Sequence, residues 1–368
     1  MTFIHRIEIT PLLFPLKKPF SNHAHTLTHI HGLDVRIITK DFMGCSFTYG
    51  LRKSPYTDVI KYIEAEITPT LFDIDSIDAL QPHWSSFWTS YRKDNTEQEK
   101  TYALSAIDIA IWDLLTKAKK ISLHQYLGAA QPKAFVYATT GWLSFSSQEL
   151  IDECTSYGKQ GISAFKVRLG HQDDYSRVQT LRKEMGDNLV LMLDANQRYS
   201  AEQAIQISNE LVKFNITWLE EPTNYSSEEL ERVKKGSKIP LAIGESILNE
   251  HDFERICEKE LTDYLQPDLP RCGGITGFCR VAEIALKYKL PLCSHLMPQL
   301  SASLIAAYPN GYMVEYDNLL PPGIFVHTLS VHKGSIILPN LPGTGVELTQ
   351  QALKQFGIHT YILESKRL

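Results

Sequence analysis

The chain has 368 residues, enough to bury a large core, and its 43% hydrophobic and 21% charged residues are an ordinary globular composition. A net charge of −5, with no basic run interleaved with aromatic residues, argues against nucleic-acid binding. No apolar run approaches the roughly 18 residues of a membrane span, so we expect neither nucleic acid nor a membrane as a partner.

The six cysteines form no C-x-x-C pair, and their scatter predicts free thiols rather than a disulfide framework. The N-terminal segment MTFIHRIEITPLLFPLKKPF alternates and is broken by Pro11 and Pro15, unlike a signal peptide. We therefore expect a cytoplasmic protein.

Residues 1–125 are predicted to form an α+β domain. The runs IHRIEITPLLF and DVRIITKDFMG alternate between apolar and polar residues, which predicts strands, and the polar, turn-rich segment PFSNHAHTLTHIHG lies between them. Three stretches between residues 56 and 127 have helical spacing. The most apolar, TYALSAIDIAIWDLLTKAKK, predicts a helix buried between two layers.

From residue 134 onward the pattern becomes strand then helix, repeated. Several predicted helices open with a capping box: Ser146 with Glu149, Ser200 with Gln203, and Ser226 with Glu229. Near-continuous apolar strands alternating with helices indicate a parallel sheet. The apolar runs number eight, which favours a closed barrel over residues 126–325: AFVYATTGW, AFKVRLG, LVLMLDAN, ITWLEEP, IPLAIGES, DYLQPDLP, LPLCSH and GYMVEYD. We expect residues 326–368 to pack back on the first domain or to cap the barrel.

Three of these runs end in a carboxylate: Asp194, Glu220 and Glu245, at intervals of 26 and 25 residues. Such an interval is about one strand, one helix and two loops, so the three side chains are predicted to meet at the same end of the barrel. Isolated acids at strand ends are common, but three in register are less expected by chance. An all-oxygen site of this kind suits a hard divalent cation such as Mg²⁺.

The strand ends carry further polar residues: Lys166, Arg168, Asn196, Glu221, Asp268, His295 and Glu315. A cation on the three carboxylates would stabilise charge that develops on a substrate carboxylate when the adjacent C–H is deprotonated. His295 is the candidate base, and Asp268 would hydrogen-bond its other ring nitrogen. Lys166 is either a second base or a cation that binds a carboxylate. Glu315, if protonated, would hydrogen-bond the other carboxylate oxygen.

Each of these residues also has a structural interpretation. A single histidine after an apolar run is more often structural, an aspartate before Leu-Pro forms turns, and Lys166 and Arg168 suit the surface. Their joint placement at successive strand ends favours the functional interpretation.

The order of the motifs Lys-x-Arg, LDANQ, WLEEP, GES, QPDLPRCGGIT, SHLMPQLSA and VEY resembles the enolase superfamily, and within it the mandelate racemase group. The resemblance covers essentially the whole chain. It implies an α+β capping domain over a (β/α)₇β barrel, completed by the C-terminal segment. It also implies Mg²⁺ on Asp194, Glu220 and Glu245, with Glu221 behind these ligands, and abstraction of the proton next to a carboxylate.

One position departs from the family pattern. The strand that carries Lys166 commonly ends in Lys-x-Lys, whose second lysine is a base, and here that position is Arg168, which keeps its proton. A racemase with a base on each face of the carbon is therefore disfavoured. A site with His295 as acid and base fits dehydration of an acid sugar, the predicted activity. A racemase or epimerase that uses Lys166, and a non-catalytic barrel that binds metal and a carboxylate, remain alternatives.

The segment with His23, His25, His29 and His31 corresponds in the resembling family to a lid that selects the substrate, which predicts a hydrophilic ligand. Tyr49 and Arg52 are expected to act in the same way. The predicted ligand is a small-molecule carboxylate held by six residues, and we expect a homo-oligomer. The six residues are Asn196, Arg168, Glu315, His23, His25 and Tyr49.

Overall fold

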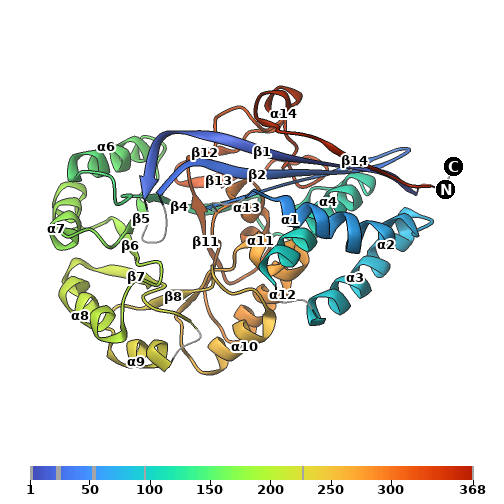
Figure 1. The fold of residues 1–368 in the computed structure, drawn as a ribbon. Coiled ribbons are helices and arrows are strands. Elements are labelled where there is room, and N and C mark those ends of the chain that lie inside the picture. The colour runs from blue at the N-terminus through green and yellow to red at the C-terminus, as the bar shows by residue number, and fades with distance from the viewer. Residues whose placement is uncertain (1–2, 22–25, 52–54, 95–96, 226–227, 367–368) are drawn as a thin grey trace.

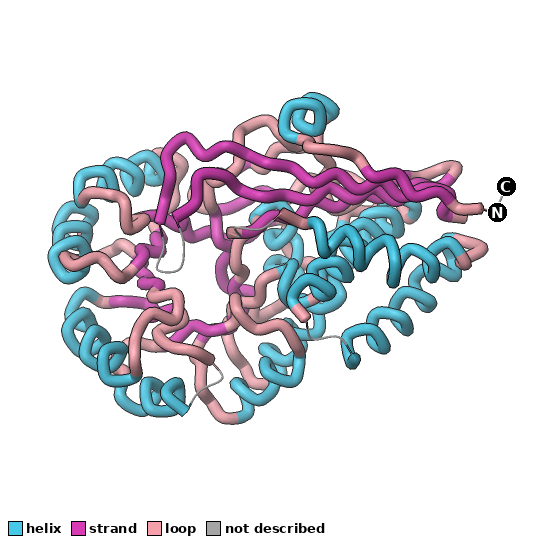
Figure 2. The backbone as a smooth tube through the Cα atoms, viewed as in Figure 1, coloured by secondary structure: helices cyan, strands magenta, loops and turns pink. Residues whose placement is uncertain are grey.

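The computed structural model describes residues 3–21, 26–51, 55–94, 97–225 and 228–366. An antiparallel sheet and its helices lie against one side of a closed barrel of parallel strands (Figure 1). Figure 2 shows the long strands of that sheet crossing over the barrel. The fold predicted from the strand and helix periods is confirmed.

The antiparallel sheet has the order β14-β1-β2-β3 among the described strands. These are β1 (Ile4–Ser21), β2 (Thr26–Thr39), β3 (Met43–Gly50) and β14 (Tyr361–Glu364). The strands run further than the alternation suggested, because Ser21 on β1 pairs with Thr26 on β2 and most of the polar segment between the runs is strand. His23 and His25 lie outside the described residues, as does Arg52.

The helices of the N-terminal half follow the predicted order: α1 (Thr57–Tyr62), the π-helix η1 (Ile63–Ile67), α2 (Thr68–Phe72), α3 (Ile77–Asp94), α4 (Gln98–Ala118) and α5 (Leu123–Tyr126). Helix α4 is the one predicted to be buried between two layers, and it is. On one side it approaches β3 so closely that a Cβ at Gly44 would lie 2.1 Å from the carbonyl oxygen of Ala110. On the other side Trp112 Nε1 donates to Thr276 Oγ1 on the barrel at 2.9 Å.

Within the described ranges, eight parallel strands form the barrel, and β11 pairs with β4 to close it. The strands are β4 (Lys133–Thr140), β5 (Ala164–Arg168), β6 (Val190–Asp194), β7 (Ile216–Glu220), β8 (Leu241–Ile243), β9 (Tyr264–Leu265), β10 (Leu292–Cys293) and β11 (Gly311–Tyr316). The helices between them are α6 (Ser147–Gly158), α7 (Asp174–Met185), α8 (Ala201–Leu211) with the 3₁₀ turn η2 (Val212–Phe214), α9 (Glu228–Gly236), α10 (Glu250–Glu258), α11 (Leu269–Cys272), α12 (Gly274–Lys287) and α13 (Pro298–Ala307).

Two of the three predicted capping boxes are present, at Ser146 with Glu149 and at Ser200 with Gln203. The third falls on Ser226, outside the described residues. After the barrel, the hairpin of β12 (Ser330–His332) and β13 (Ser335–Ile337) adds to β4. The chain then forms α14 (Gln350–Phe356) and returns to the first sheet, where β14 pairs with β1.

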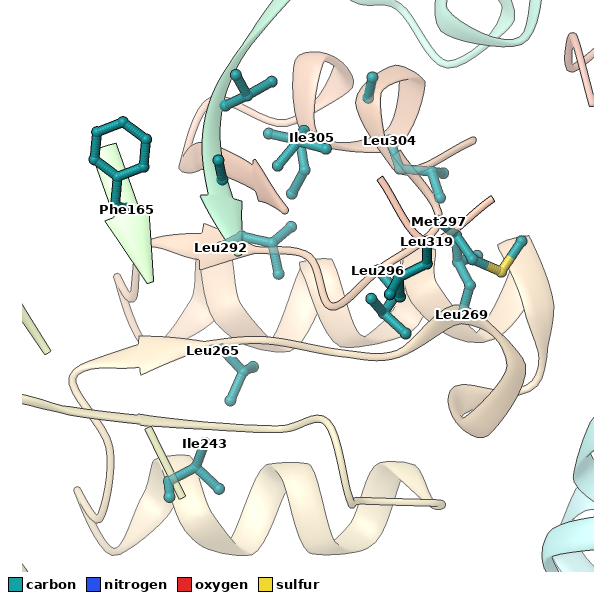
Figure 3. Packing of buried hydrophobic residues seen from close by; sticks show 14 of the residues in the cluster. Phe165, Ile243, Leu265, Leu269, Leu292, Leu296, Met297, Leu304, Ile305 and Leu319 are labelled. Atoms are coloured by element: carbon teal, nitrogen blue, oxygen red, sulfur yellow. The ribbon is translucent and has the colours of Figure 1, made fainter. Parts of the chain in front are cut away.

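The main core fills the space between the barrel strands and the surrounding helices. Figure 3 shows part of it, with Leu265 and Leu292 on barrel strands and Leu304 and Ile305 on α13. A smaller cluster inside the barrel contains Tyr137, Ala164, Met192, Trp218, Ala242 and Cys293. The predicted free thiols are confirmed for all six cysteines. None of the helices in the described part of the chain has the length and apolar composition that crossing a bilayer requires.

Candidate active site and metal centre

Sheet register brings the three predicted carboxylates together at one end of the barrel. Asp194 pairs with Arg168 on β5 and with Glu220 on β7, and Glu245 follows the end of β8. One oxygen from each of Asp194, Glu220 and Glu245 lies within 4.8 Å of the others, and all three residues are buried. The predicted convergence is therefore found in the structure.

Glu245 reaches this position because the residue before it has no side chain. A Cβ on Gly244, which has a φ of +152°, would lie 2.7 Å from the backbone of Gln266 on the neighbouring strand. The glycine of the GES motif therefore allows the ends of β8 and β9 to approach each other.

Lys166 neutralises the cluster from within the barrel. Its Nζ lies 2.7 Å from Glu220 Oε1, 2.9 Å from Glu315 Oε1 and 3.3 Å from Asp194 Oδ2, and its side chain is fully buried. Burial acts to lower the pKa of Lys166, but these three carboxylates outweigh it and raise the pKa above its ordinary value. The side chain is therefore a fixed ammonium in this arrangement and not a surface lysine.

Arg168 points into the barrel on the same face of β5. Its Nη1 donates to Asp194 and, at 2.8 Å, to Asn196 Oδ1, and its guanidinium lies 5.1 Å from the centre of the Trp142 ring. The Asn196 backbone N–H in turn donates to Asp194 Oδ1 at 2.9 Å. Arg168 and Asn196 thus orient a predicted metal ligand, and Arg168 keeps its proton, because neighbouring acids raise its pKa against the effect of burial.

His295 lies on the other side of the cluster. Its Nδ1 is 2.7 Å from Asp268 Oδ2, and its Nε2 is 3.1 Å from Glu245 Oε2. Burial alone lowers the pKa of His295, but the charges of Glu245, Glu315 and Asp268 outweigh it and raise the pKa to about 9. Asp268 also accepts from the Arg271 backbone N–H through Oδ1, so it caps α11 and orients the imidazole at once.

Glu315 lies between Lys166 and His295 at the end of β11. Its Oε1 accepts from Thr139, and its Oε2 accepts from the Leu296 backbone N–H at 2.7 Å. Burial acts to raise the pKa of Glu315. The positive charges of Lys166, His295 and Arg168 outweigh burial and lower that pKa to about 2. In this arrangement the lowered pKa favours an ionised Glu315 that accepts hydrogen bonds over the proton donor considered from the sequence.

Glu221 supports the cluster from behind and bridges two strand ends. It accepts from Gln197 Nε2 at 2.9 Å and from both the backbone N–H and the hydroxyl of Ser246, the neighbour of Glu245. Burial and the charge of Glu245 raise the pKa of Glu221 to about 7.

A cavity of about 540 Å³ opens near the ends of β4 and β11, and the three carboxylates do not line it. Its walls include Lys17 and Lys18 of β1, Trp142 after β4, and Tyr316 and Asp317 beside Glu315. Tyr49, predicted to bind substrate, is buried behind this region. Its hydroxyl donates to Asp317 Oδ2 at 2.7 Å and accepts from the Met297 backbone N–H.

Two residues at the site were missed from the sequence. Trp218 Nε1 and Gln266 Nε2 both donate to Glu220 Oε2, at 3.3 and 3.1 Å. Trp218 precedes Glu220 by two positions, and Gln266 precedes Asp268 by two. Because side chains two apart on a strand share a face, this spacing was a signal that pointed to both.

The residue types fit a hard divalent cation. The donors are carboxylate oxygens, which such a cation prefers. Burial raises the pKa of Glu220, and the nearby charge of Asp194 raises it further. Oε2 of Glu245 is buried and receives no well-aligned hydrogen bond from the described residues, although His295 Nε2 lies 3.1 Å away. A cation at this point would relieve the repulsion between the carboxylates.

Comparison with known proteins gives a consistent result along the chain. Residues 35–128 match the family model of the mandelate racemase/muconate lactonizing enzyme N-terminal domain, and residues 149–352 match the enolase C-terminal domain-like model. L-talarate/galactarate dehydratase of Salmonella typhimurium is 27% identical over 95% of this chain and 90% of its own length. 3,6-Anhydro-alpha-L-galactonate cycloisomerase of Streptomyces coelicolor is 26% identical over 96% and 99%. A solved structure of L-talarate dehydratase from a Polaromonas species, complexed with Mg and L-glucarate, has a TM-score of 0.89 at 27% identity and covers 100% of both chains.

Proposed function

Because the chain belongs to the mandelate racemase/muconate lactonizing enzyme group of the enolase superfamily, we propose that it is a Mg²⁺-dependent acid-sugar dehydratase. It would remove water from an aldonic or aldaric acid and release a 2-keto-3-deoxy acid. Relatives that dehydrate such acids, and the neighbouring structure with Mg and L-glucarate, support this proposal.

The contrast between His295 and Lys166 carries the proposal. His295 Nε2 faces the cluster, with Asp268 behind its Nδ1. Lys166 is held as an ammonium by three carboxylates, and Arg168 is held by Asp194 and Asn196. Once the acids around it are neutralised, His295 is suited to proton transfer near neutral pH, whereas Lys166 and Arg168 keep their protons. A single such group favours a reaction on one face of the carbon, as dehydration requires, over inversion by two bases.

The proposed metal ligands are Asp194, Glu220 and Glu245. When bound there, Mg²⁺ supplies Lewis acidity that stabilises negative charge on the substrate carboxylate. Lys166, at the centre of the cluster, is placed to donate a hydrogen bond to that carboxylate.

His295 then takes the proton from C2 through Nε2, while Asp268 accepts from Nδ1–H and fixes the tautomer. The electron pair of the C2–H bond forms the C2–C3 double bond, and the C3–O bond breaks. The proton on His295 leaves with the hydroxyl group as water, and the enol product becomes the 2-keto acid. Only neutral imidazole can accept the first proton. The charge of the acids around His295, of which Glu245 is a proposed metal ligand, would therefore have to be offset by the bound cation.

The test is incubation with Mg²⁺ in D₂O over a panel of aldonic and aldaric acids, followed by NMR. A 2-keto-3-deoxy acid is the expected product, and His295→Asn should abolish its formation. Deuterium exchange with inversion at C2 would instead identify a racemase or epimerase. Absence of exchange with every acid, from folded protein that binds Mg²⁺, would favour a non-catalytic barrel or a substrate outside the panel.

A further inference from the structure

The two oxygens of Glu220 have different surroundings. Oε2 accepts from Gln266 Nε2 at 3.1 Å and from Trp218 Nε1 at 3.3 Å. Oε1 is 2.7 Å from Lys166 Nζ, which also contacts Asp194 Oδ2, so Oε1 faces the middle of the cluster. One oxygen is therefore fixed by uncharged N–H donors, and the other faces the Lys166 ammonium, which also contacts Asp194.

Gln266 is held in place by a second hydrogen bond. Its Nε2 also donates to the Tyr137 hydroxyl at 3.3 Å, which in turn donates to the Ser294 carbonyl oxygen at 2.9 Å. Ser294 precedes His295, so this chain of hydrogen bonds runs from Glu220 to the strand that carries the candidate base. The Gln266 side chain is 1% exposed, so water does not compete for these contacts.

The Trp218 ring is fixed by its aromatic neighbours. It packs edge-on against Tyr137, with 5.4 Å between the ring centres. It also packs at a tilt against Tyr264, with 5.0 Å between the ring centres. These contacts leave its Nε1–H directed at Glu220. Both donors to Oε2 are thus supported by the interior of the barrel.

From this geometry we infer that Gln266, assisted by Trp218, is a positioning residue that restricts Glu220 to binding a cation through one oxygen. A carboxylate that offers one oxygen suits Mg²⁺, which requires near-octahedral geometry at about 2.1 Å. A carboxylate free to rotate can offer both oxygens, which Ca²⁺ accepts in its larger and more flexible coordination shell. Gln266 therefore favours Mg²⁺ over Ca²⁺. This inference rests on the proposed Mg²⁺ site.

The experiment is calorimetric titration of the metal-free protein with Mg²⁺ and with Ca²⁺, in the absence of substrate. Gln266→Met removes the side-chain amide, which donates to Glu220 and to Tyr137, at nearly constant volume. We expect this variant to lower the affinity for Mg²⁺ about 10-fold, with a smaller loss of affinity for Ca²⁺. Trp218→Phe removes the other donor and keeps an aromatic ring beside Tyr137 and Tyr264. It should shift the Mg²⁺/Ca²⁺ ratio in the same direction by a smaller factor, and it remains informative if the glutamine variant folds poorly.

Asn310 provides a matched control at the opposite end of the barrel. Its Nδ2 donates to the Leu290 carbonyl oxygen at 2.9 Å, and its Oδ1, like Oε1 of Gln266, is buried with no hydrogen bond from the described residues. Asn310→Ala should lower thermal stability and leave the Mg²⁺/Ca²⁺ ratio unchanged. An unchanged ratio in both Gln266→Met and Trp218→Phe would overturn the positioning role while leaving the metal site intact. A wild-type protein that binds no Mg²⁺ would overturn the proposed function as well.

Discussion

His295 and Asp268 are joined through both backbone and side chains, although they are 27 residues apart. They form a parallel β-bridge, and His295 Nδ1 lies 2.7 Å from Asp268 Oδ2. We expect Asp268→Asn to lower kcat by about 10²- to 10⁴-fold, because asparagine cannot hold the Nδ1–H tautomer. The measurement is kcat on the acid that the substrate panel identifies.

This variant separates two roles of the same side chain. Asparagine caps a helix as well as aspartate does, so α11 should keep its N-terminal hydrogen bond to Arg271, and Mg²⁺ affinity and thermal stability should stay near wild type. A kcat equal to that of the wild type would show that Asp268 serves only as a cap.

Lys166 is expected to stabilise the metal-free protein. It touches three buried carboxylates, so Lys166→Met leaves uncompensated charge, at a cost of about 3–5 kcal/mol in the free energy of unfolding. Mg²⁺ should restore part of that loss, since it supplies positive charge to the same acids. Urea unfolding in EDTA and in Mg²⁺ measures both effects.

Lys259 is the matched control for this experiment, because its ion pair with Glu231 is exposed to solvent. Lys259→Met should change the free energy of unfolding by less than about 1 kcal/mol, with no dependence on Mg²⁺. If Lys166→Met is no more destabilising in EDTA than Lys259→Met, the carboxylates do not depend on the lysine.

The barrel and the cluster at its mouth were predictable because both follow from periods in the sequence. Apolar runs once per strand–helix unit place Asp194, Glu220 and Glu245 at one end, and strand register then brings them within 4.8 Å. The contacts of Lys166 were not predictable, since a two-residue alternation gives the face of a strand but not which carboxylates lie across the barrel. The ionisation of Glu315 depends on those same contacts.

The extended β1–β2 pair was missed for a related reason. The polar composition of the segment between the two alternating runs suggested a loop. Cross-strand partners such as Ser21 and Thr26, however, supply hydrogen bonds that the local sequence does not reveal. Trp218 and Gln266 lie two positions before Glu220 and Asp268, on the same faces but one layer below the strand ends at which the site was predicted.

Asp108 should make stability depend on pH away from the active site. It lies in α4 and accepts from Trp84 Nε1 at 2.7 Å and from the Thr276 backbone N–H at 2.9 Å. Burial raises its pKa from 3.8 to about 6, although the hydrogen bonds from Thr276 and Trp84 oppose the rise. A raised folded-state pKa contributes stability that is present below pH 4 and lost as the pH rises to about 6.

The stability advantage of the wild type over Asp108→Asn should therefore shrink by about 2 kcal/mol between pH 4 and pH 7. Urea unfolding of both proteins across this range measures the difference, in which the other titrating groups cancel. An advantage that grows with pH would mean that the hydrogen bonds outweigh burial.

Gly244 is expected to control the position of Glu245. A Cβ at residue 244 would lie 2.7 Å from the Gln266 backbone, so Gly244→Ala must push the ends of β8 and β9 apart, at a cost of about 1–3 kcal/mol. Since Glu245 follows directly, Mg²⁺ affinity should fall along with the melting temperature. Gly128→Ala is the control, because Gly128 also has a positive φ but no atom lies near its Cβ position. Equal losses of stability in the two variants, with Mg²⁺ affinity retained in both, would show that the close approach of β8 to β9 does not hold Glu245 in place.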